Sequence, residues 1–355
     1  MLIQIHMLQN YAPSNLNRDD TGSPKDAVFG GVRRGRISSQ CLKRSIRRSS
    51  VFEEAFRGDG LLASRTRLLP ELIAQELKAL QASPEDIEAI VRRVPEIGRE
   101  SARASAARAG EDDALETKQL IFVAPNELGP LARDLLAQYQ AAGAKWPTTK
   151  IDAITAGLAR TMPRSVDVAM FGRMTTSAAF EDVQASVQVA HALSTNALTQ
   201  EFDYYTAVDD LSDEPGADMI GDIEYNSCTY YKYINAHWEG LLDNLGGDVP
   251  VACRAVVALL EAAAVAQPTG KQNTFAAQNL PDYILVEVRE RNMPVSYANA
   301  FLKPVRPGPN GDPTLMERSV IALEEYAVRL RDRYGLGGDQ RAALCVPDVP
   351  LADLP

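Results

Sequence analysis

The sequence has little histidine or cysteine, the residue types that most often hold transition metals or act as nucleophiles. Its four cysteines are scattered without C-x-x-C spacing, which excludes both a disulfide framework and a zinc site as predictions. They are Cys41, Cys228, Cys253 and Cys345. The three histidines, His6, His191 and His237, form no catalytic or metal-binding pattern, so each is expected to be structural. No cofactor is therefore expected.

Long apolar runs are also absent. No stretch approaches the ~20 apolar residues of a membrane span, and the opening Met1–Ile5 lacks the basic start and apolar run of a signal peptide. A cytoplasmic location and no membrane partner are the expectations. The length of 355 residues suggests one elaborated domain or two to three smaller ones.

Positive charge is missing from one part of the chain and concentrated in another. Between Arg173 and Lys232 there is no Lys or Arg, although the segment holds eleven Asp or Glu. The first fifty residues carry nine Lys or Arg against three Asp, within a chain whose net charge is −10. Affinity for a polyanion depends on locally clustered cations, so the overall acidity does not exclude a nucleic-acid partner.

Residues 17–48 combine three features that suit phosphate binding. A helix beginning near Ser38 or Ser39 would place Leu42 and Ile46 on one face and a polar, basic group on the other. That group is Gln40, Lys43, Arg44 and Arg47. The helix N-terminus would add unsatisfied N–H groups, and Gly30, Gly31 and Gly35 would let the backbone approach a ligand closely. A solvated, charged surface is the plainer alternative.

Two other kinds of site receive less support from the sequence. Asp19, Asp20 and Asp26 could gather a divalent ion, but orienting Arg18 and Lys25 or capping turns is the favoured interpretation. Gly270-Lys271-Gln272 lacks the first glycine and the Ser or Thr of a phosphate-binding loop, which argues against nucleotide hydrolysis.

The predicted fold is α+β. Alternation over residues 2–8 predicts a half-buried strand, and further strands are expected at 165–171 and 282–288, with extended segments at 202–208 and 223–234. Helices are expected at 182–194, 251–266 and 315–334, the last ending at Gly335. Without insertions the order is strand, helix, strand, strand, helix, strand, which is the split βαβ of a ferredoxin-like or RNA-recognition-like sheet.

Two insertions interrupt this order. Residues 62–159 have a helical, Ala- and Leu-rich pattern typical of an inserted subdomain. The acidic, aromatic-rich segment around 202–231 indicates a long protruding hairpin, which could wedge apolar side chains between bases, dock on the basic surface of another copy, or simply be solvated. Asp209–Asp213 lacks the spacing of a calcium loop.

The sequence resembles the CasC family, the crRNA-binding backbone subunit of the type I-E CRISPR complex called Cascade. The resemblance covers most of the chain and rests on several ordered motifs. They are Leu16-Asn17-Arg18-Asp19-Asp20, residues 25–31, residues 36–44, Gly172-Arg173-Met174, residues 202–211, Gly270-Lys271-Gln272 with Ala276-Ala277, and residues 296–301.

The resemblance implies a hand-shaped protein. Its palm, an RNA-recognition-like sheet, would comprise residues 1–60, 161–194 and 234–355, its helical fingers 61–160, and its thumb hairpin 195–233. Copies would stack head to tail along the crRNA spacer, with thumbs kinking the guide at intervals so that target DNA pairs between them, alongside other Cascade subunits. The implied RNA-binding residues are Arg18, Lys25, Ser38, Gln40, Lys43, Arg44, Arg47, Met174 and Lys271, and the implied thumb wedge is Thr206 and Ile220.

The family's lysine-rich finger helix is not visible in this sequence, because residues 131–158 hold only Arg133, Lys145 and Lys150 as cations. Three hypotheses follow. The first is a non-catalytic guide-binding subunit that grips the backbone without sequence preference. The second is a metal-dependent ribonuclease backbone subunit that cleaves target RNA, and the third is an acidic scaffold that binds only proteins.

Overall fold

The structure is a computed structural model that describes residues 1–97, 116–117, 119–159, 161–175, 177, 179–208, 217–336 and 338–349. The chain divides into two compact units. The first unit contains Met1–Phe52, Val187–Trp238 and Val256–Pro355, and the second contains Glu53–Ser186 and Glu239–Ala255. Among the described residues, no helix is both long and apolar enough to cross a membrane.

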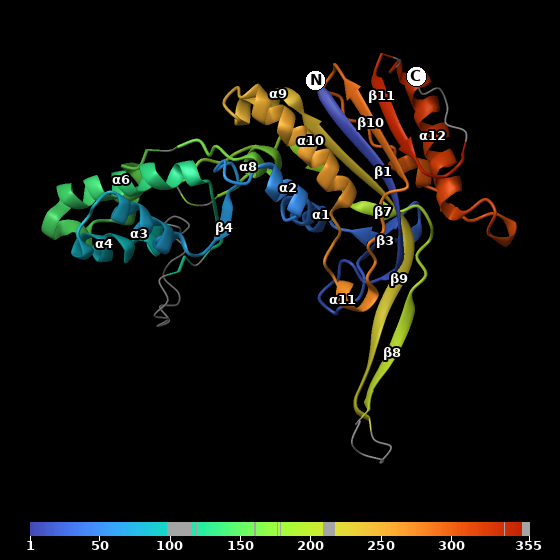
Figure 1. The fold of residues 1–355 in the computed structure, drawn as a ribbon, viewed down its shortest axis with the longest axis horizontal. Coiled ribbons are helices and arrows are strands. Elements are labelled where there is room, and N and C mark those ends of the chain that lie inside the picture. The colour runs from blue at the N-terminus through green and yellow to red at the C-terminus, as the bar shows by residue number, and fades with distance from the viewer. Residues whose placement is uncertain are drawn as a thin grey trace. The chain divides into compact units, whose positions relative to one another are not determined.

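The first unit is built on an antiparallel sheet (Figure 1). Its described strands are β1 (Leu2–Ser14), β2 (Asp26–Phe29), β3 (Val32–Ile37), β6 (Val187–Val189), β7 (Ala192–Ser194), β8 (Glu201–Val208), β9 (Ala217–His237), β10 (Tyr283–Arg289) and β11 (Gln340–Cys345). The order across the sheet is β11-β10-β1-β9-β7-β3-β2, and β6 and β8 also pair with β9. The long strand β1 therefore lies between β9 and β10, which it contacts in continuous register from Leu2 to Leu8.

Strand β1 differs from its prediction in being covered on both faces. Gln4 and His6, expected on a solvent face, are fully buried. Gln4 accepts a hydrogen bond from the Tyr233 hydroxyl at 2.7 Å, and His6 Nδ1 lies 2.8 Å from the Tyr231 hydroxyl. These tyrosine hydroxyls give both buried side chains a hydrogen-bond partner, so the sequence alternation is present although neither Gln4 nor His6 meets water.

The helices of the first unit are α1 (Ser39–Arg47), α11 (Gln272–Phe275), α12 (Leu315–Tyr334), the 3₁₀ turns η2 (Ala298–Phe301) and η3 (Pro309–Gly311), and the part of α10 (Val249–Val265) from Val256 onward. Helix α12 begins with a capping box between Thr314 and Glu317 and ends at Gly335, which has φ 65°. Val320, Leu323 and Ala327 of α12 pack on sheet residues such as Leu285 to form a buried core.

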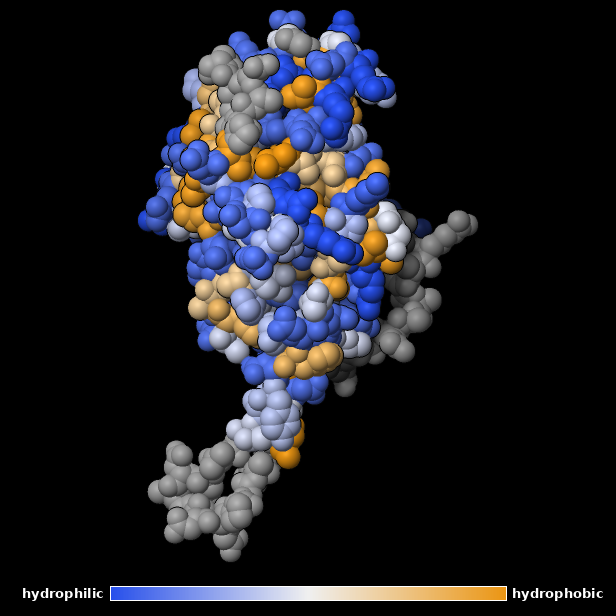
Figure 2. All heavy atoms as spheres, turned by 90° about the vertical axis from the view of Figure 1, so that its right-hand side faces the viewer, coloured by the Kyte–Doolittle hydropathy of each residue, from blue (hydrophilic) through white to orange (hydrophobic). Residues whose placement is uncertain are grey.

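Strands β8 and β9 continue beyond the sheet as a two-stranded hairpin (Figure 1). Thr206 pairs with Ile220 near the end of its described part, and residues 209–216 lie outside that part. The space-filling view shows the hairpin projecting as a narrow arm that carries hydrophobic as well as polar side chains (Figure 2). The predicted hairpin is confirmed, although its acidic motif at Asp209–Asp210 lies outside the described residues.

The second unit is mainly helical. Its described elements are the end of α2 (Ser50–Ala55), β4 (Ser64–Thr66), α3 (Leu69–Ala79), α4 (Pro84–Val91), α5 (Val94–Ile97), β5 (Ile121–Val123), α6 (Pro125–Ala142), η1 (Gly143–Thr148), α7 (Ile151–Ala156), α8 (Val166–Phe171), most of α9 (Trp238–Asn244) and the start of α10. Leu69, Ile73, Leu131, Leu135 and Trp146 belong to one buried core. The helical character of the predicted insertion is therefore confirmed.

Two predicted elements are wrong. Residues 165–171, read as a strand, form helix α8, in which buried Asp167 accepts hydrogen bonds from the N–H groups of Ala63 and Val168. Residues 182–194, read as a helix, contain β6 and β7, because Val187–Val189 and Leu193–Ser194 pair with β9. The α+β class with an antiparallel sheet is confirmed, whereas the division into palm, fingers and thumb stays a prediction.

Candidate nucleic-acid interface

Helix α1 presents its polar face as the sequence predicts. Ser38 is the N-cap, and its hydroxyl accepts a hydrogen bond from the Cys41 N–H at 3.3 Å. Leu42 and Ile46 are buried. On the other face Gln40 and Arg44 are exposed, whereas Lys43 and Arg47 are half-buried.

The N-terminus of α1 offers fewer free N–H groups than expected. The Ser38 N–H donates to Asn17 Oδ1 at 2.8 Å, and the Ser39 N–H donates to His191 Nδ1 at 3.1 Å. With the Cys41 N–H bound to Ser38, three donors that the sequence offered to a phosphate are occupied by the protein. The predicted anion site of free backbone N–H groups is therefore wrong at these positions, and Ser38 serves as a nearly buried cap.

The loop before β2 brings two cations beside this helix. The Asn17 carbonyl accepts the Lys25 N–H at 2.8 Å, and Asn15 Nδ2 donates to the Gly22 carbonyl at 3.0 Å. These bonds close the segment between Arg18 and Lys25 into a compact turn. Asn17 therefore joins the loop to the helix, because its backbone carbonyl binds Lys25 and its side chain binds Ser38 at the start of α1.

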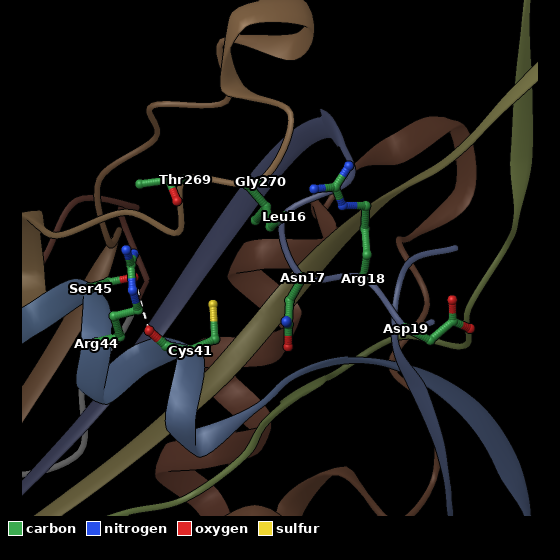
Figure 3. Close-up of a pocket in the computed structure, with 9 residues that line it drawn as sticks. All are labelled: Leu16, Asn17, Arg18, Asp19, Cys41, Arg44, Ser45, Thr269 and Gly270. Atoms are coloured by element: carbon green, nitrogen blue, oxygen red, sulfur yellow. Dashed lines mark hydrogen bonds between the residues drawn. The ribbon is translucent and has the colours of Figure 1, made fainter. Parts of the chain in front are cut away.

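A pocket of about 340 Å³ lies between this loop, α1 and the segment before α11. It is lined by Leu16, Asn17, Arg18, Asp19, Cys41, Arg44, Ser45, Thr269 and Gly270. Arg18 and Arg44 lie on opposite sides of the pocket, with Cys41 and Asn17 between them (Figure 3). Two guanidinium groups that flank polar side chains can bind a phosphate from both sides.

The cations around the pocket affect the pKa values of neighbouring groups. Burial raises the pKa of the Cys41 thiol, and Lys25 and Arg44 act against that rise. Burial, Arg36 and Lys25 together lower the pKa of His191, which keeps its Nδ1 an acceptor for the Ser39 N–H. Lys25, Arg36 and Arg44 therefore lie close to the start of α1, and Arg36 joins the cations that the sequence singled out.

Arg18, Lys25 and Arg44 have no carboxylate within ion-pair distance in the part of the chain that the structure describes. Two other cations of the N-terminal segment have structural roles. Arg34 is fully buried and donates to four backbone carbonyls, those of Ser194, Thr195, Phe301 and Leu302. Arg33 pairs with Asp26. The basic surface is therefore smaller than the count of nine cations suggests.

Two of the three glycines of this segment, Gly30 and Gly35, are required by the fold. A Cβ on Gly30 would come within 2.1 Å of the Leu302 carbonyl oxygen, and one on Gly35 within 2.6 Å of the Tyr230 hydroxyl. Both positions need glycine because another part of the chain occupies the space. The expectation that they leave room for a ligand is therefore wrong for Gly30 and Gly35, whereas a Cβ on Gly31 would meet no atom within 4 Å.

Lys271 lies in the segment that closes the pocket. It has φ 51° and precedes α11, and a Cβ on its neighbour Gly270 would come within 2.3 Å of the Leu16 carbonyl oxygen. This close approach joins the 268–277 loop to the Arg18 loop. Lys271 is half-buried and does not itself line the pocket.

Three predicted residues are not among those that line the pocket. Met174, in the second unit, is 94% exposed although its neighbour Arg173 is anchored by a buried pair with Glu127 at 2.7 Å. Thr206 and Ile220 face each other across β8 and β9, and both are exposed. Displaying an apolar side chain on an anchored support is the geometry that insertion between bases requires.

Two of the three carboxylates that the sequence singled out, Asp19 and Asp26, have protein partners. Asp19 accepts hydrogen bonds from the Thr21 hydroxyl and from the N–H groups of Thr21 and Ser23, and the Thr21 hydroxyl bond is the main cause of its lowered pKa. Asp26 pairs with Arg33. The described residues contain no group of three or more His, Cys, Asp or Glu suited to a metal ion.

Sequence reasoning gave no role to four residues at this site: Asn17, Cys41, Ser45 and Thr269. The helical wheel could have found Ser45 and Cys41, since both lie one turn from Arg44 or Arg48. Nothing in the sequence points to Thr269, which reaches the pocket only through the tertiary contact between Gly270 and Leu16.

A family model described as CT1975-like protein matches residues 3–353 of the chain. Among solved structures, a chain of a "CRISPR RNA-guided surveillance complex, pre-nicking" is 30% identical with a TM-score of 0.79, and the match covers 99% of this chain and 94% of that one. A chain of a "CRISPR RNA-guided surveillance complex" is 25% identical with a TM-score of 0.59, covering 98% of this chain and 90% of that one. No curated protein matches.

Proposed function

The chain belongs to the CT1975-like protein family, and from this premise we propose that it is a non-catalytic, guide-RNA-binding backbone subunit of a CRISPR surveillance complex. One observation carries the proposal. Arg18 from the loop before β2 and Arg44 from α1 line one pocket, Lys25 of the same loop lies near its Cys41, and none of the three cations has a carboxylate partner among the described residues. The similarity to surveillance-complex chains over nearly the whole length supports it.

The guide would be held through its phosphates. Arg18 and Arg44 flank a pocket of about 340 Å³ that would take a phosphate group, and Gln40 and Lys43 extend the polar face along α1. Backbone contacts carry no sequence information, so binding would be independent of sequence. Specificity for a target would come from base pairing with the guide.

The finer assignment is to the CasC family of type I-E Cascade, in the cytoplasm. In this reading the first unit is an RNA-recognition-like palm. The order β10-β1-β9 followed by β6 and β7, with α1 before β6 and α10 before β10, supports it because it is the strand order of a split βαβ sheet. The second unit would supply helical fingers.

The β8–β9 hairpin would act as the thumb. Copies would assemble head to tail along the crRNA, other Cascade subunits would join them, and Thr206 with Ile220 would wedge against the guide at intervals. Target DNA would pair in the segments between wedges. The exposed pairing of Thr206 with Ile220 and the 94% exposed Met174 support these roles.

The first test is RNA binding by an Arg18→Ala, Arg44→Ala double variant. We expect it to weaken binding to all RNA sequences alike. The slope of log affinity against log salt should become shallower by about 0.7, because the variant loses the one phosphate that both arginines contact and each phosphate contact on a single strand contributes ~0.7. Fluorescence anisotropy over a salt series, with two unrelated RNA sequences, measures both effects.

The matched control is Arg329→Ala, which removes an exposed arginine from α12, where it pairs with Glu325. It should leave the affinity and the salt slope unchanged. A protein-only scaffold predicts no RNA binding by the wild-type chain at all. Loss of affinity for one RNA sequence but not the other would contradict backbone recognition.

The proposal also separates this chain from a metal-dependent ribonuclease. Incubation of the guide-bound protein with complementary RNA and Mg²⁺ should give no regularly spaced cuts. Asp26 is engaged by Arg33, which supports a structural role for that carboxylate. Cuts that disappear in Asp20→Ala or Asp26→Ala would show that the chain is an enzyme.

A further inference from the structure

The β8–β9 hairpin leaves the sheet at a defined point. Strand β9 pairs with β1 as far as Asn226, opposite Ser14, and from Tyr225 outward its described partner is β8. Tyr225 and Glu224 are therefore the first residues of β9 beyond the support of the central sheet. The direction of the hairpin depends on what holds these two residues.

Two contacts fasten this base. Asn15 Nδ2 donates to the Glu224 carbonyl at 2.9 Å, and the Tyr225 ring lies against the Phe275 ring with centroids 5.6 Å apart. Asn15 is fully buried, and its Nδ2 also donates to Gly22 in the Arg18 loop. The same amide thus joins the hairpin to the loop that carries Arg18.

Both contacts lead to segments that line the pocket. Asn15 directly precedes Leu16, and Phe275 ends the loop that contributes Thr269 and Gly270. That loop is held firmly, since the Phe275 N–H donates to the Lys271 carbonyl at 3.0 Å and Gly270 abuts the Leu16 carbonyl. Pocket and hairpin base are therefore joined through neighbouring residues on two sides.

We propose that Asn15 and Phe275 are positioning residues, which set the direction of the hairpin relative to the pocket that holds a guide phosphate. This inference rests on the proposed function. The five residue-to-residue steps along the strand from Tyr225 to Ile220 span about 17 Å, so a tilt of about 10° at the base moves the wedge by about 3 Å. That displacement is comparable with the spacing of stacked bases, so loss of either contact would misplace the wedge.

A positioning role and a merely stabilising role predict different results. If Phe275 only stabilises its loop, its removal weakens RNA binding and leaves the pattern of contacts along the RNA unchanged. If it positions the hairpin, the pattern changes while the pocket still binds. Phe275→Tyr keeps a ring against Tyr225 and should behave as wild type.

The first experiment uses the free protein, so its result does not depend on RNA binding. In Phe275→Ala, amide hydrogen exchange should become at least about threefold faster in the hairpin, at residues 201–206 and 220–225, with β1 and β10 unchanged. Leu280→Ala is the control, since Leu280 is exposed in the following segment. Wild-type exchange in the hairpin of Phe275→Ala would overturn the proposal whether or not the chain binds RNA.

The second experiment measures nuclease accessibility along a spacer-length RNA coated with protein. Wild type and Phe275→Tyr should give regularly spaced accessible nucleotides. Phe275→Ala should blur this spacing while overall affinity stays within about threefold. The Arg18→Ala, Arg44→Ala variant should do the opposite, losing affinity while the RNA that is still coated keeps its spacing.

The outcomes separate the two proposals. Failure of wild type to bind RNA would refute the proposed function, and the exchange experiment would still decide whether Phe275 holds the hairpin. Normal spacing in Phe275→Ala, or affinity lost with the spacing intact, would refute the positioning role alone. Asn15→Ser is the second variant and should also make exchange in the hairpin faster, because serine puts a shorter hydroxyl in place of the amide that bonds to Glu224.

Discussion

Lys232 lies in the middle of β9 with a side chain that is 2% exposed. Its ammonium group has no hydrogen-bond partner among the described residues and lies 6.0 Å from the centre of the Tyr11 ring. Burial lowers its pKa to about 7. A buried cation without a partner destabilises the fold, because its lost hydration is replaced only by a weak interaction with the ring.

Replacement of Lys232 by Met should therefore stabilise the protein at and below neutral pH, by about 1–3 kcal/mol in the free energy of unfolding. Below about pH 7 both the folded and the unfolded chains carry the charge, so the burial cost is fully present. Between that pH and the ordinary lysine pKa only the unfolded chain binds the proton, so wild-type stability rises with pH. Lys232→Met should remove this rise.

Urea unfolding at about pH 6 and about pH 9 measures the effect. Lys303→Met, which changes an exposed lysine, is the control and should leave stability unchanged at both pH values. A Lys232→Met protein that is less stable than wild type at the lower pH, or that keeps the wild-type pH dependence, would contradict the argument.

Lys232 also illustrates what charge counts conceal. The sequence distinguishes a basic N-terminal segment from an acidic hairpin, but it does not show which cations meet solvent. Arg34 and Lys232 are buried, whereas Arg18 and Arg44 line the pocket. That distinction depends on strand pairing and on contacts between distant segments, which local sequence patterns do not encode.

Elements defined by local signals were predicted closely. Helix α1 follows from the Ser38 cap and from Leu42 and Ile46 on one face, and α12 spans the predicted 315–334 and ends at Gly335 as expected. Each of these signals acts within one or two turns of the helix. These helix signals can therefore be recognised in the sequence without knowledge of the tertiary structure.

Elements whose secondary structure depends on distant pairing partners were predicted wrongly. Residues 182–194 have apolar residues spaced as in a helix, yet Val187 and Val189 pair with β9, almost fifty residues away. Residues 165–171 have a strand-like composition, yet Asp167 fixes a helix by accepting from the Ala63 N–H at 3.0 Å. In both cases tertiary hydrogen bonds outweigh local propensity.

The residues of the candidate site likewise divide into those that a local pattern predicts and those that depend on contacts between distant segments. Gln40, Lys43 and Arg44 were found because one helix face carries them. Asn17 and Thr269 were missed because their roles arise from loops that meet only in the folded chain. The contact of Phe275 with Tyr225, which connects the pocket to the hairpin, also arises only in the folded chain.

The whole molecule separates its charges by function. Its net charge of −10 would repel RNA, but unpaired cations gather at the pocket while carboxylates such as Asp203 and Asp222 lie on the projecting hairpin. A basic surface on one part of the first unit and an acidic arm on another are not equivalent. Complementary, non-equivalent surfaces favour head-to-tail association, which does not close on itself.

The copy number on RNA should therefore be set by the length of the strand. We expect the mass of the protein–RNA complex to rise in equal steps as the RNA is lengthened, because each copy covers a fixed number of nucleotides and an open interface has no built-in end. The RNA strand also raises the effective concentration of neighbouring copies, so assembly should occur on RNA at protein concentrations where the free chain does not assemble.

Mass photometry over a series of RNA lengths measures the steps in mass. An RNA too short for two copies should bind one and is the control. A mass that does not change with RNA length, or equally large assemblies formed without RNA, would show that the strand does not template assembly.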